Sequence, residues 1–249
     1  WSWHLWLTGS DIEASTIQTS AGEFMDRNLG AYHNGNGSTN ADDLYHSIGV
    51  YYQWGRKDPF MLPGRGVTAP ADVITALSQN LSSIESTIPN PTVVYDDSYW
   101  GDDQTLWGEF KTKYDPCPAG WRVPEGGYNG GVGESGMPDG IWAKAGFTRQ
   151  GLTPFVDGES NMLGKVFSTP LCTPATWYPA AGSIEYNTGK LCYVGVDGVY
   201  HSTSAFGGTD AHVTGLLFNY LPNSGGHYIY CGGEKFTRAG GASVRCCKE

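Results

Sequence analysis

Residues 114–124 read Tyr114-Asp-Pro-Cys-Pro-Ala-Gly-Trp-Arg-Val-Pro124. Prolines on both sides of Cys117 fix the φ angle there, so the stretch predicts a rigid corner that a disulfide at Cys117 can pin. Trp121 offers a large apolar side chain to a core, and Arg122 beside it can donate to carbonyls or to a carboxylate. These residues are typical of a scaffold rather than of catalytic chemistry.

The composition of the whole chain excludes several classes of protein. The 249 residues include 36 Gly and 14 Pro, with 13% aromatic and 16% charged residues. A helical bundle needs more Ala, Leu, Glu and Lys, and a disordered chain is poor in aromatics. The net charge of −10 disfavours binding to nucleic acid or to anionic lipid. No apolar run is long enough to predict a transmembrane span, and from the start at Trp1 we expect a mature product or an excised piece.

Cysteine usage points to an oxidising compartment. The six cysteines include no Cys-x-x-Cys pair, which disfavours a redox motif or a zinc ribbon. An even count favours a disulfide framework, for which 15 connectivities are open. Buried free thiols in a cytosolic protein are the alternative. We expect an exported protein.

Hydrophobic periodicity predicts few helices and many short strands. Helices are predicted at 71–86, 103–113 and 140–146. Strands are predicted at 1–7, 165–169, 176–180, 190–196, 213–220, 226–231 and 242–248. Helices early and strands late predict an α+β fold with an antiparallel sheet.

Five segments resemble, in this order, the Fibrobacter succinogenes major paralogous domain. They are Trp1-Ser-Trp-His-Leu-Trp6, Met25-Asp-Arg-Asn-Leu-Gly-Ala31, Tyr51-Tyr-Gln-Trp-Gly-Arg-Lys-Asp-Pro-Phe60, the corner at 114–124 and Ser243-Val-Arg-Cys-Cys-Lys-Glu249. The resemblance implies a C-type-lectin-like fold of mixed, mostly antiparallel sheets, two or three short helices and long Gly-rich loops. It implies a single domain over 1–249 with insertions, following other modules of a longer surface protein. Such domains occur in Bacteroidetes surface proteins, including fimbrillin-type tip proteins.

Three bridges are expected among the cysteines: Cys117–Cys246, Cys172–Cys192 and Cys231–Cys247. The resemblance implies the first, because it brings Cys117 to the last strand. The cysteines of the second flank a strand–turn–strand segment whose turn is at 187–189. The third follows by elimination.

Aromatic and polar residues between 200 and 237 carry the binding hypothesis. Tyr among Ser, Gly and Asn is typical of adaptable recognition surfaces. The candidate ligand-binding residues are Tyr200, His201, Phe206, Asp210, His212, Tyr220, His227, Tyr228 and Tyr230. His201 stands where the family commonly has Trp, which predicts a tailored surface rather than a core contact. Alternating aromatics are also typical of a core, so we expect about half of these residues to be buried.

Metal and catalytic motifs are weak. The chain lacks the Glu-Pro-Asn or Gln-Pro-Asp triplets of calcium-dependent C-type lectins, so we expect no cofactor. An acidic cluster could hold calcium, although a solvated loop is the commoner interpretation. The cluster consists of Asp96, Asp97, Asp102 and Asp103. The histidines never lie three or four residues apart, and neither a nucleophile elbow nor a P-loop is present. Paired carboxylates of glycosidases depend on spacing in three dimensions, so the sequence leaves that alternative open.

The expected function is non-enzymatic binding or adhesion at the cell surface, with a glycan or protein ligand, as in a fimbrial tip component. The expected partners include other fimbrial subunits but no nucleic acid. The expected location is extracellular, associated with the outer membrane through parts outside this chain. One alternative is a structural pilus or surface-assembly subunit, which would show an exposed groove or an unpaired edge strand. The other is an enzyme of the formylglycine-generating branch of the fold, which would use a reactive pair of cysteines.

Overall fold

The computed structural model describes residues 4–38, 40–61, 71–72, 76–78, 83–95, 105–126, 140–145, 152–155, 164–169, 172–205, 212–221 and 226–249. This part of the chain is mostly β-sheet with a few short helices, so the predicted α+β class is confirmed. The helices are α1 (Ala41–Tyr45), the 3-10 helix η1 (Ile84–Thr87) and α2 (Ile141–Lys144). None of the described helices is long and apolar enough to cross a membrane.

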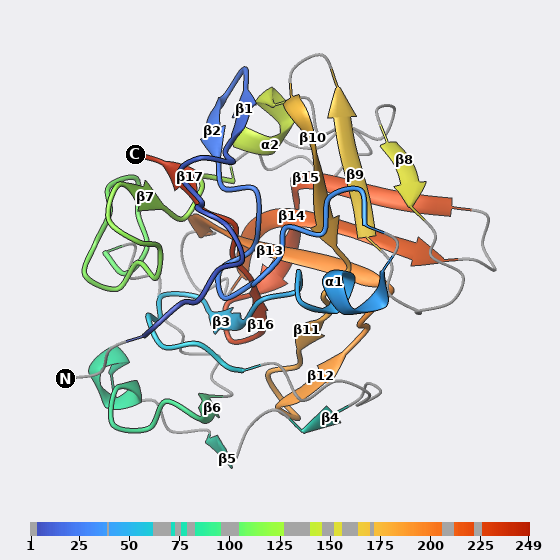
Figure 1. The fold of residues 1–249 in the computed structure, drawn as a ribbon. Helices are drawn as coiled ribbons and strands as arrows, with labels where there is room; N and C mark the ends of the chain where they lie inside the picture. Colours follow the sequence, from blue (N-terminus) through green and yellow to red (C-terminus); the bar gives the residue numbers. More distant parts are fainter. Residues whose placement is uncertain are drawn as a thin grey trace.

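One sheet gathers the two ends of the chain around its middle. Its seven described strands are, in order, β7 (Trp121–Arg122), β17 (Cys247–Lys248), β2 (Gly22–Phe24), β1 (Ile17–Thr19), β10 (Cys172–Pro179), β9 (Gly164–Thr169) and β8 (Leu152–Phe155). All of these pairings are antiparallel. The last strand therefore lies between the corner strand β7 and the early strand β2 (Figure 1).

The second sheet contains the longest strands. Its path runs β15 (Gly226–Thr237), β14 (His212–Leu221), β13 (Asp197–Ala205), β16 (Gly241–Ser243), β11 (Ser183–Ile184), β12 (Lys190–Cys192) and β4 (Ala71–Asp72), and β3 (Tyr51–Gln53) pairs with β16. A small parallel pair joins β5 (Ala76–Ser78) to β6 (Val93–Tyr95). In Figure 1, β9 and β10 cross in front of the long strands β14 and β15.

The two sheets pack against each other through three apolar clusters, of which one is centred on aromatic rings of the long strands. Tyr178 of β10 meets Tyr200 of β13 and Phe218 of β14 there, and Trp142 of α2 joins them. The ring centroids of Tyr178 and Tyr200 are 5.0 Å apart. Aromatic side chains of this size dominate core energetics, so this cluster fixes how the sheets cross.

A buried arginine connects the motif that closes the chain with the motif near its start. Arg245 is fully buried, and its Nε and Nη2 atoms donate to Asn28 Oδ1 at 3.0 and 2.9 Å. The same guanidinium donates to Thr176 Oγ1 and to the Trp177 carbonyl, and it lies 3.8 Å above the centre of the Tyr178 ring. Neutral acceptors and a π face thus satisfy this charge, because a buried cation without such partners would be costly.

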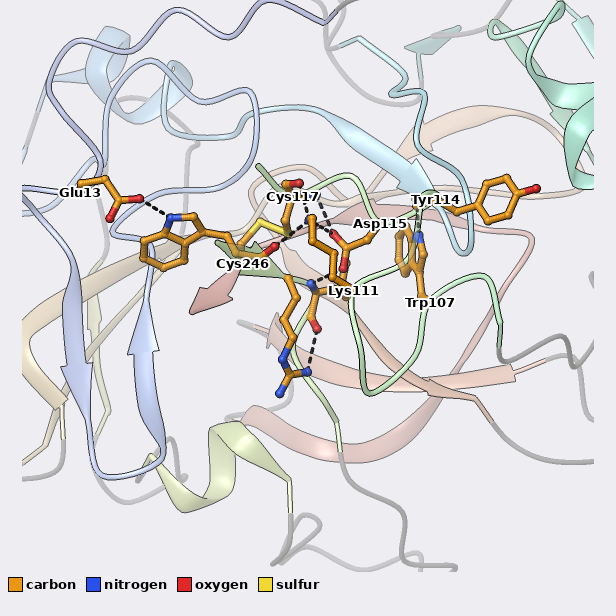
Figure 2. Close-up of a disulfide and its surroundings, with 10 residues drawn as sticks. Glu13, Trp107, Lys111, Tyr114, Asp115, Cys117 and Cys246 are labelled. Atoms are coloured by element: carbon orange, nitrogen blue, oxygen red, sulfur yellow. Dashed lines mark hydrogen bonds and ion pairs between the residues drawn. A yellow bond between two sulfur atoms is a disulfide. The ribbon is translucent and has the colours of Figure 1, made fainter. Parts of the chain in front are cut away.

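The corner at 114–124 forms as predicted. Cys117 and Cys246 are joined by a disulfide with a Cα–Cα distance of 6.0 Å (Figure 2). The Asp115 carboxylate accepts hydrogen bonds from the backbone N–H groups of Cys117 and Val123 at 2.8 and 3.0 Å. Lys111 Nζ donates to Asp115 Oδ1 and to the Cys117 carbonyl. The corner is therefore held by one covalent bond and one buried carboxylate.

Trp121 is the core anchor that the sequence predicts. Its side chain is fully buried, and its Nε1 donates to Glu13 Oε1 at 2.5 Å. Lys248 Nζ lies 4.4 Å from the centre of the Trp121 ring and 2.6 Å from Glu13 Oε2. The segment around Glu13 and the last strand β17 are thus tied to the corner.

The other two predicted bridges, Cys172–Cys192 and Cys231–Cys247, are not formed. The thiols of Cys192 and Cys247 are free. The turn predicted at 187–189 joins β11 to β12, and the register of this hairpin places Cys192 opposite Ser183. Cys172 lies instead on β10, opposite Thr19 of β1 and Thr169 of β9. Cys231 lies on β15 of one sheet and Cys247 on β17 of the other.

Most predicted late elements are confirmed. Strands β9, β10, β14 and β15 cover the predicted ranges, and α2 lies within the predicted helix 140–146. Strand β12 ends at Cys192, where the chain enters a turn, and the predicted strand 242–248 is broken into β16 and β17.

Three early predictions are wrong. The segment 71–86 contains β4, β5 and the start of η1 instead of a helix, because β4 pairs with β12 and β5 with β6. Residues 105–113 form turns, and the Thr112 hydroxyl bonds the Leu106 carbonyl, which closes a loop rather than a helix. Residues 4–7 are not in a sheet, since Trp6 turns inward and donates from Nε1 to the Ala31 carbonyl.

Candidate ligand-binding surface

Tyr200 and His201, predicted as surface residues, lie in the core. Their exposed fractions are 1% and 0%. Strand β13 lies between β14 and β16, and the packed sheets cover its faces. The prediction of a tailored surface at His201 is therefore wrong, and neither side chain reaches a ligand.

Both side chains have internal partners. The Tyr200 hydroxyl donates to the Pro179 carbonyl at 2.7 Å and accepts from Asn28 Nδ2 at 3.3 Å. His201 Nε2 lies 2.9 Å from the Tyr52 carbonyl, and its ring packs edge to face against Trp107. Burial lowers the pKa of His201 to about 4, and the carbonyl contact only partly opposes this shift.

The candidate ligand-binding residues on β14 and β15 are described at least through their backbone. His212 is partly exposed at the start of β14, and its carbonyl accepts from Arg238 Nε. The strand pairing places Tyr220 opposite His227, so these two residues share one face of the hairpin. Tyr228 and Tyr230 also lie on β15, opposite β14. For Tyr220 and the three β15 residues, only the backbone is described.

Several sequence candidates lie outside the described residues altogether. They are Phe206, Asp210 and the acidic cluster Asp96, Asp97, Asp102 and Asp103. Among the residues that the structure does describe, no group of three or more His, Cys, Asp or Glu side chains could hold a metal ion.

A different set of aromatic side chains, exposed or partly exposed, gathers on the segment 32–46. We call it the Tyr–His cluster, and it consists of Tyr32, His33, Tyr45 and His46. Tyr32 is 47% exposed, and the side chain of His33 is 42% exposed. The segment includes α1, which is drawn in blue near the centre of Figure 1. The surface is therefore built from a loop and a one-turn helix.

The four rings contact one another. The ring centroids of Tyr32 and His33 are 4.8 Å apart with the ring planes at 88°, and those of Tyr45 and His46 are 5.6 Å apart at 69°. His46 also lies 6.5 Å from Tyr32 and 6.4 Å from His33, measured between centroids. Such edge-to-face pairs are the favoured geometry for aromatic rings, so the cluster has a defined arrangement.

Backbone hydrogen bonds hold this arrangement. The N–H groups of Tyr32 and His33 donate to the His46 carbonyl at 3.0 and 3.2 Å, which joins the two Tyr-His pairs. The Tyr32 carbonyl accepts from the Gly9 N–H and from Arg27 Nη1, both at 2.9 Å. The loop is thus bonded on both sides of its first aromatic residue.

A buried ion pair supports the loop from below. Arg27 Nε and Asp26 Oδ1 are 2.7 Å apart, and both side chains are almost fully buried. Asp26 Oδ2 also accepts from Asn34 Nδ2 at 2.8 Å. Burial raises the pKa of Asp26, but the hydrogen bonds from Arg27 and Asn34 and the charge of Arg27 outweigh it, so the pKa lies below its ordinary value.

Gly35 allows the loop to approach the core. A Cβ atom at Gly35 would lie 2.5 Å from Trp177 Cδ1, and its φ of +69° is a conformation that other residues rarely adopt. Trp177 in turn donates from Nε1 to Ser47 Oγ, just after the cluster. Trp177 therefore serves as the floor of the loop.

Polar groups border the rings. His33 Nε2 lies 3.6 Å from Asp43 Oδ1, and Ser38 Oγ donates to Asp43 Oδ2 at 2.9 Å. Asn40 caps α1 by accepting from the Asp42 N–H. The surface thus offers aromatic faces with donors and acceptors beside them, which is an arrangement suited to recognition rather than to bond breaking.

The sequence contains a signal for this cluster that the predictions above did not use. Two Tyr-His pairs flank the run Asn34-Gly-Asn-Gly-Ser-Thr-Asn40, which is the composition expected of a recognition loop.

Comparison of the chain with protein-family models, with curated proteins and with solved structures finds no match.

Proposed function

We propose that this chain is a non-enzymatic binding module of the cell surface, and that the Tyr–His cluster contacts its ligand. The observation that carries the proposal is a set of four contacting aromatic rings, of which Tyr32 and His46 are exposed and the other two partly exposed, on a loop bonded to a buried ion pair. Holding a surface in its binding conformation lowers the entropy lost on association. The ligand is a glycan or a protein.

The state of the free thiols argues against the enzyme alternative. Burial raises the pKa of Cys247 to about 11. Burial and the nearby Glu185 carboxylate raise the pKa of Cys192 as well. A reactive cysteine needs a lowered pKa, because the thiolate is the nucleophile.

The wider setting is part of the same proposal. We infer a single C-type-lectin-like domain that acts outside the cell, as in an adhesin or a fimbrial tip protein. The motif resemblance supports this inference, and the Cys117–Cys246 disulfide is of the kind that persists in oxidising compartments.

One observation favours a structural subunit as the second candidate. Strand β15 has 12 residues and ends the path of the eight-stranded sheet, with β14 on one side within the described part of the chain. An edge strand of this length offers a row of backbone groups to an added strand. Assembly through β15 would leave the Tyr–His cluster available, so the two functions are compatible.

The test is a binding screen of the full chain on glycan and protein arrays. We expect the variant Tyr32→Ala/His33→Ala/His46→Ala to lose the hits of the wild type. Tyr186→Ala is the matched control, because Tyr186 is 39% exposed but lies in the turn between β11 and β12. Retention of every wild-type hit by the triple variant would show that ligands bind elsewhere.

A further inference from the structure

The geometry of the Tyr–His cluster restricts what can bind to it. Its rings are in direct contact, with centroids 4.8 to 6.5 Å apart and the Tyr32 and His33 planes nearly perpendicular. Tyr32 and His33 are in edge-to-face contact at 4.8 Å, so no ligand group fits between these two rings. A ligand of this pair must therefore lie on an outer ring face.

The exposed face of a ring favours a ligand with an apolar C–H surface. The faces of aromatic rings carry negative charge and attract the weakly positive hydrogens of C–H groups. Tyr32 is the most suitable ring, because it is about half exposed while its backbone is bonded to Gly9, Arg27 and His46. The exposed part of the ring can thus be contacted without disruption of the loop.

The border of the cluster favours hydroxyl groups. A neutral imidazole such as that of His33 carries one donor and one acceptor, and the Asp43 carboxylate beside it accepts. A hydroxyl group both donates and accepts, so it can satisfy either neighbour. A hexopyranose has a C–H face and a rim of hydroxyls, which matches this combination of ring face and polar border.

The charges around the cluster disfavour an acidic ligand. The cation bonded to the loop is Arg27, which is 1% exposed and already bonded to Asp26, to the Tyr32 carbonyl and to Ser10. The side chain of Asp43 is 38% exposed at the border. The chain as a whole carries a net charge of −10. A sugar carrying carboxylate or sulfate would therefore meet repulsion without a free guanidinium to bind it.

We propose that the Tyr–His cluster binds a neutral hexopyranose, with the C–H face of the sugar stacked on Tyr32 and its hydroxyls bonded to His33 and Asp43. This inference rests on the proposed binding function and names its ligand class. It requires no metal, because the contacts come from the rings and their polar border.

The test uses the full chain against immobilised neutral oligosaccharides of mannose, galactose or N-acetylglucosamine. Parallel surfaces carry sialylated oligosaccharides, sulfated oligosaccharides and a proline-rich peptide. We expect binding to at least one neutral sugar, unchanged by EDTA. Tyr32→Ala should weaken it at least about tenfold, as for a central aromatic contact, whereas Tyr32→Phe keeps the ring and should stay within about threefold. Tyr186→Ala should bind as the wild type.

Three results would overturn the inference while leaving the proposed function standing. They are Tyr32-dependent binding only to acidic oligosaccharides, Tyr32-dependent binding only to the peptide, and loss of sugar binding in EDTA. Neutral-sugar binding that Tyr32→Ala does not change would overturn both proposals for this surface. Urea unfolding of each variant separates loss of contact from loss of fold.

Discussion

The dipeptide Tyr-His occurs in two very different settings in this chain. Tyr32-His33 and Tyr45-His46 lie on the surface, where their rings form the Tyr–His cluster. Tyr200-His201 lies in the centre of the eight-stranded sheet and is buried on both sides. The same two residues therefore lie at the surface in one place and pack in the core in the other.

Backbone pairing accounts for the difference. Strand β13 has hydrogen-bonded neighbours on both edges and a second sheet against its face, so Tyr200 contacts Tyr178 and Phe218 while His201 contacts Trp107. The segment 32–46 is bonded to the rest of the molecule through its backbone and its floor, which leaves its aromatic rings outward. Exposure is set by the neighbours of the backbone and not by the residue pair.

The sharpest test of this contrast is Tyr200→Ala. Removal of a buried aromatic side chain leaves a cavity and costs about 3 to 5 kcal/mol. The Asn28 amide and the Pro179 carbonyl would also lose their partner. We expect the free energy of unfolding in urea at pH 7 to fall by about 4 kcal/mol. A loss below about 1 kcal/mol would place Tyr200 at a surface.

The same contrast shows how far sequence reasoning reaches. The shape of the corner at 114–124 was predictable, because its prolines restrict the local backbone. Its disulfide partner Cys246 is 129 positions away, and the resemblance supplied that pairing. The late strands β9, β10, β14 and the first half of β15 were predictable from hydrophobic periodicity, whereas β13 was not predicted. The burial of His201 could not be predicted, because the residues around it come from three distant parts of the chain. They are Tyr52, Trp107 and Phe236.

The prediction of a helix at 71–86 was wrong for a related reason. Its apolar residues fit a helical period, but short apolar runs fit strands equally well. The register of β5 places Leu77 opposite Val94 of β6, so a distant partner decides the conformation. The Tyr–His cluster was not predicted, because its two Tyr-His pairs are 13 positions apart in the sequence. Backbone hydrogen bonds to the His46 carbonyl bring the two pairs together.

The second prediction concerns the pH dependence of stability. The pKa of His201 in the fold is about 4, below the ordinary value of 6.5. The unfolded chain therefore takes up a proton as the pH falls below about 6.5 while the folded protein does not, so stability is full above that pH and declines toward pH 4. The decline should be on the order of 3 kcal/mol. His201→Phe should remove it.

The measurement compares unfolding profiles of the wild type and His201→Phe between pH 7.5 and about 4.5. Asp197 contributes a pH dependence of its own, because burial raises its pKa to about 6. That carboxyl makes the fold more stable as the pH falls over the same window, which partly hides the effect of His201. Comparison of the two profiles removes this contribution, which both proteins share. Parallel profiles for the two proteins would mean that His201 is solvated in both states.

The smallest effect on stability is expected for Tyr32→Ala, the surface counterpart of Tyr200→Ala. The bonds that hold the loop at this position involve the backbone N–H and carbonyl of residue 32, and alanine retains both. The loss of unfolding free energy should stay below about 1 kcal/mol, as for other exposed positions.

Urea unfolding of the two variants under the same conditions makes the comparison direct. If Tyr32→Ala costs as much as Tyr200→Ala, then the ring of Tyr32 supports the fold, and loss of binding in this variant could not be attributed to a lost ligand contact. A small cost combined with lost binding would separate the two roles of the same dipeptide, because only the surface pair would then be free to serve recognition.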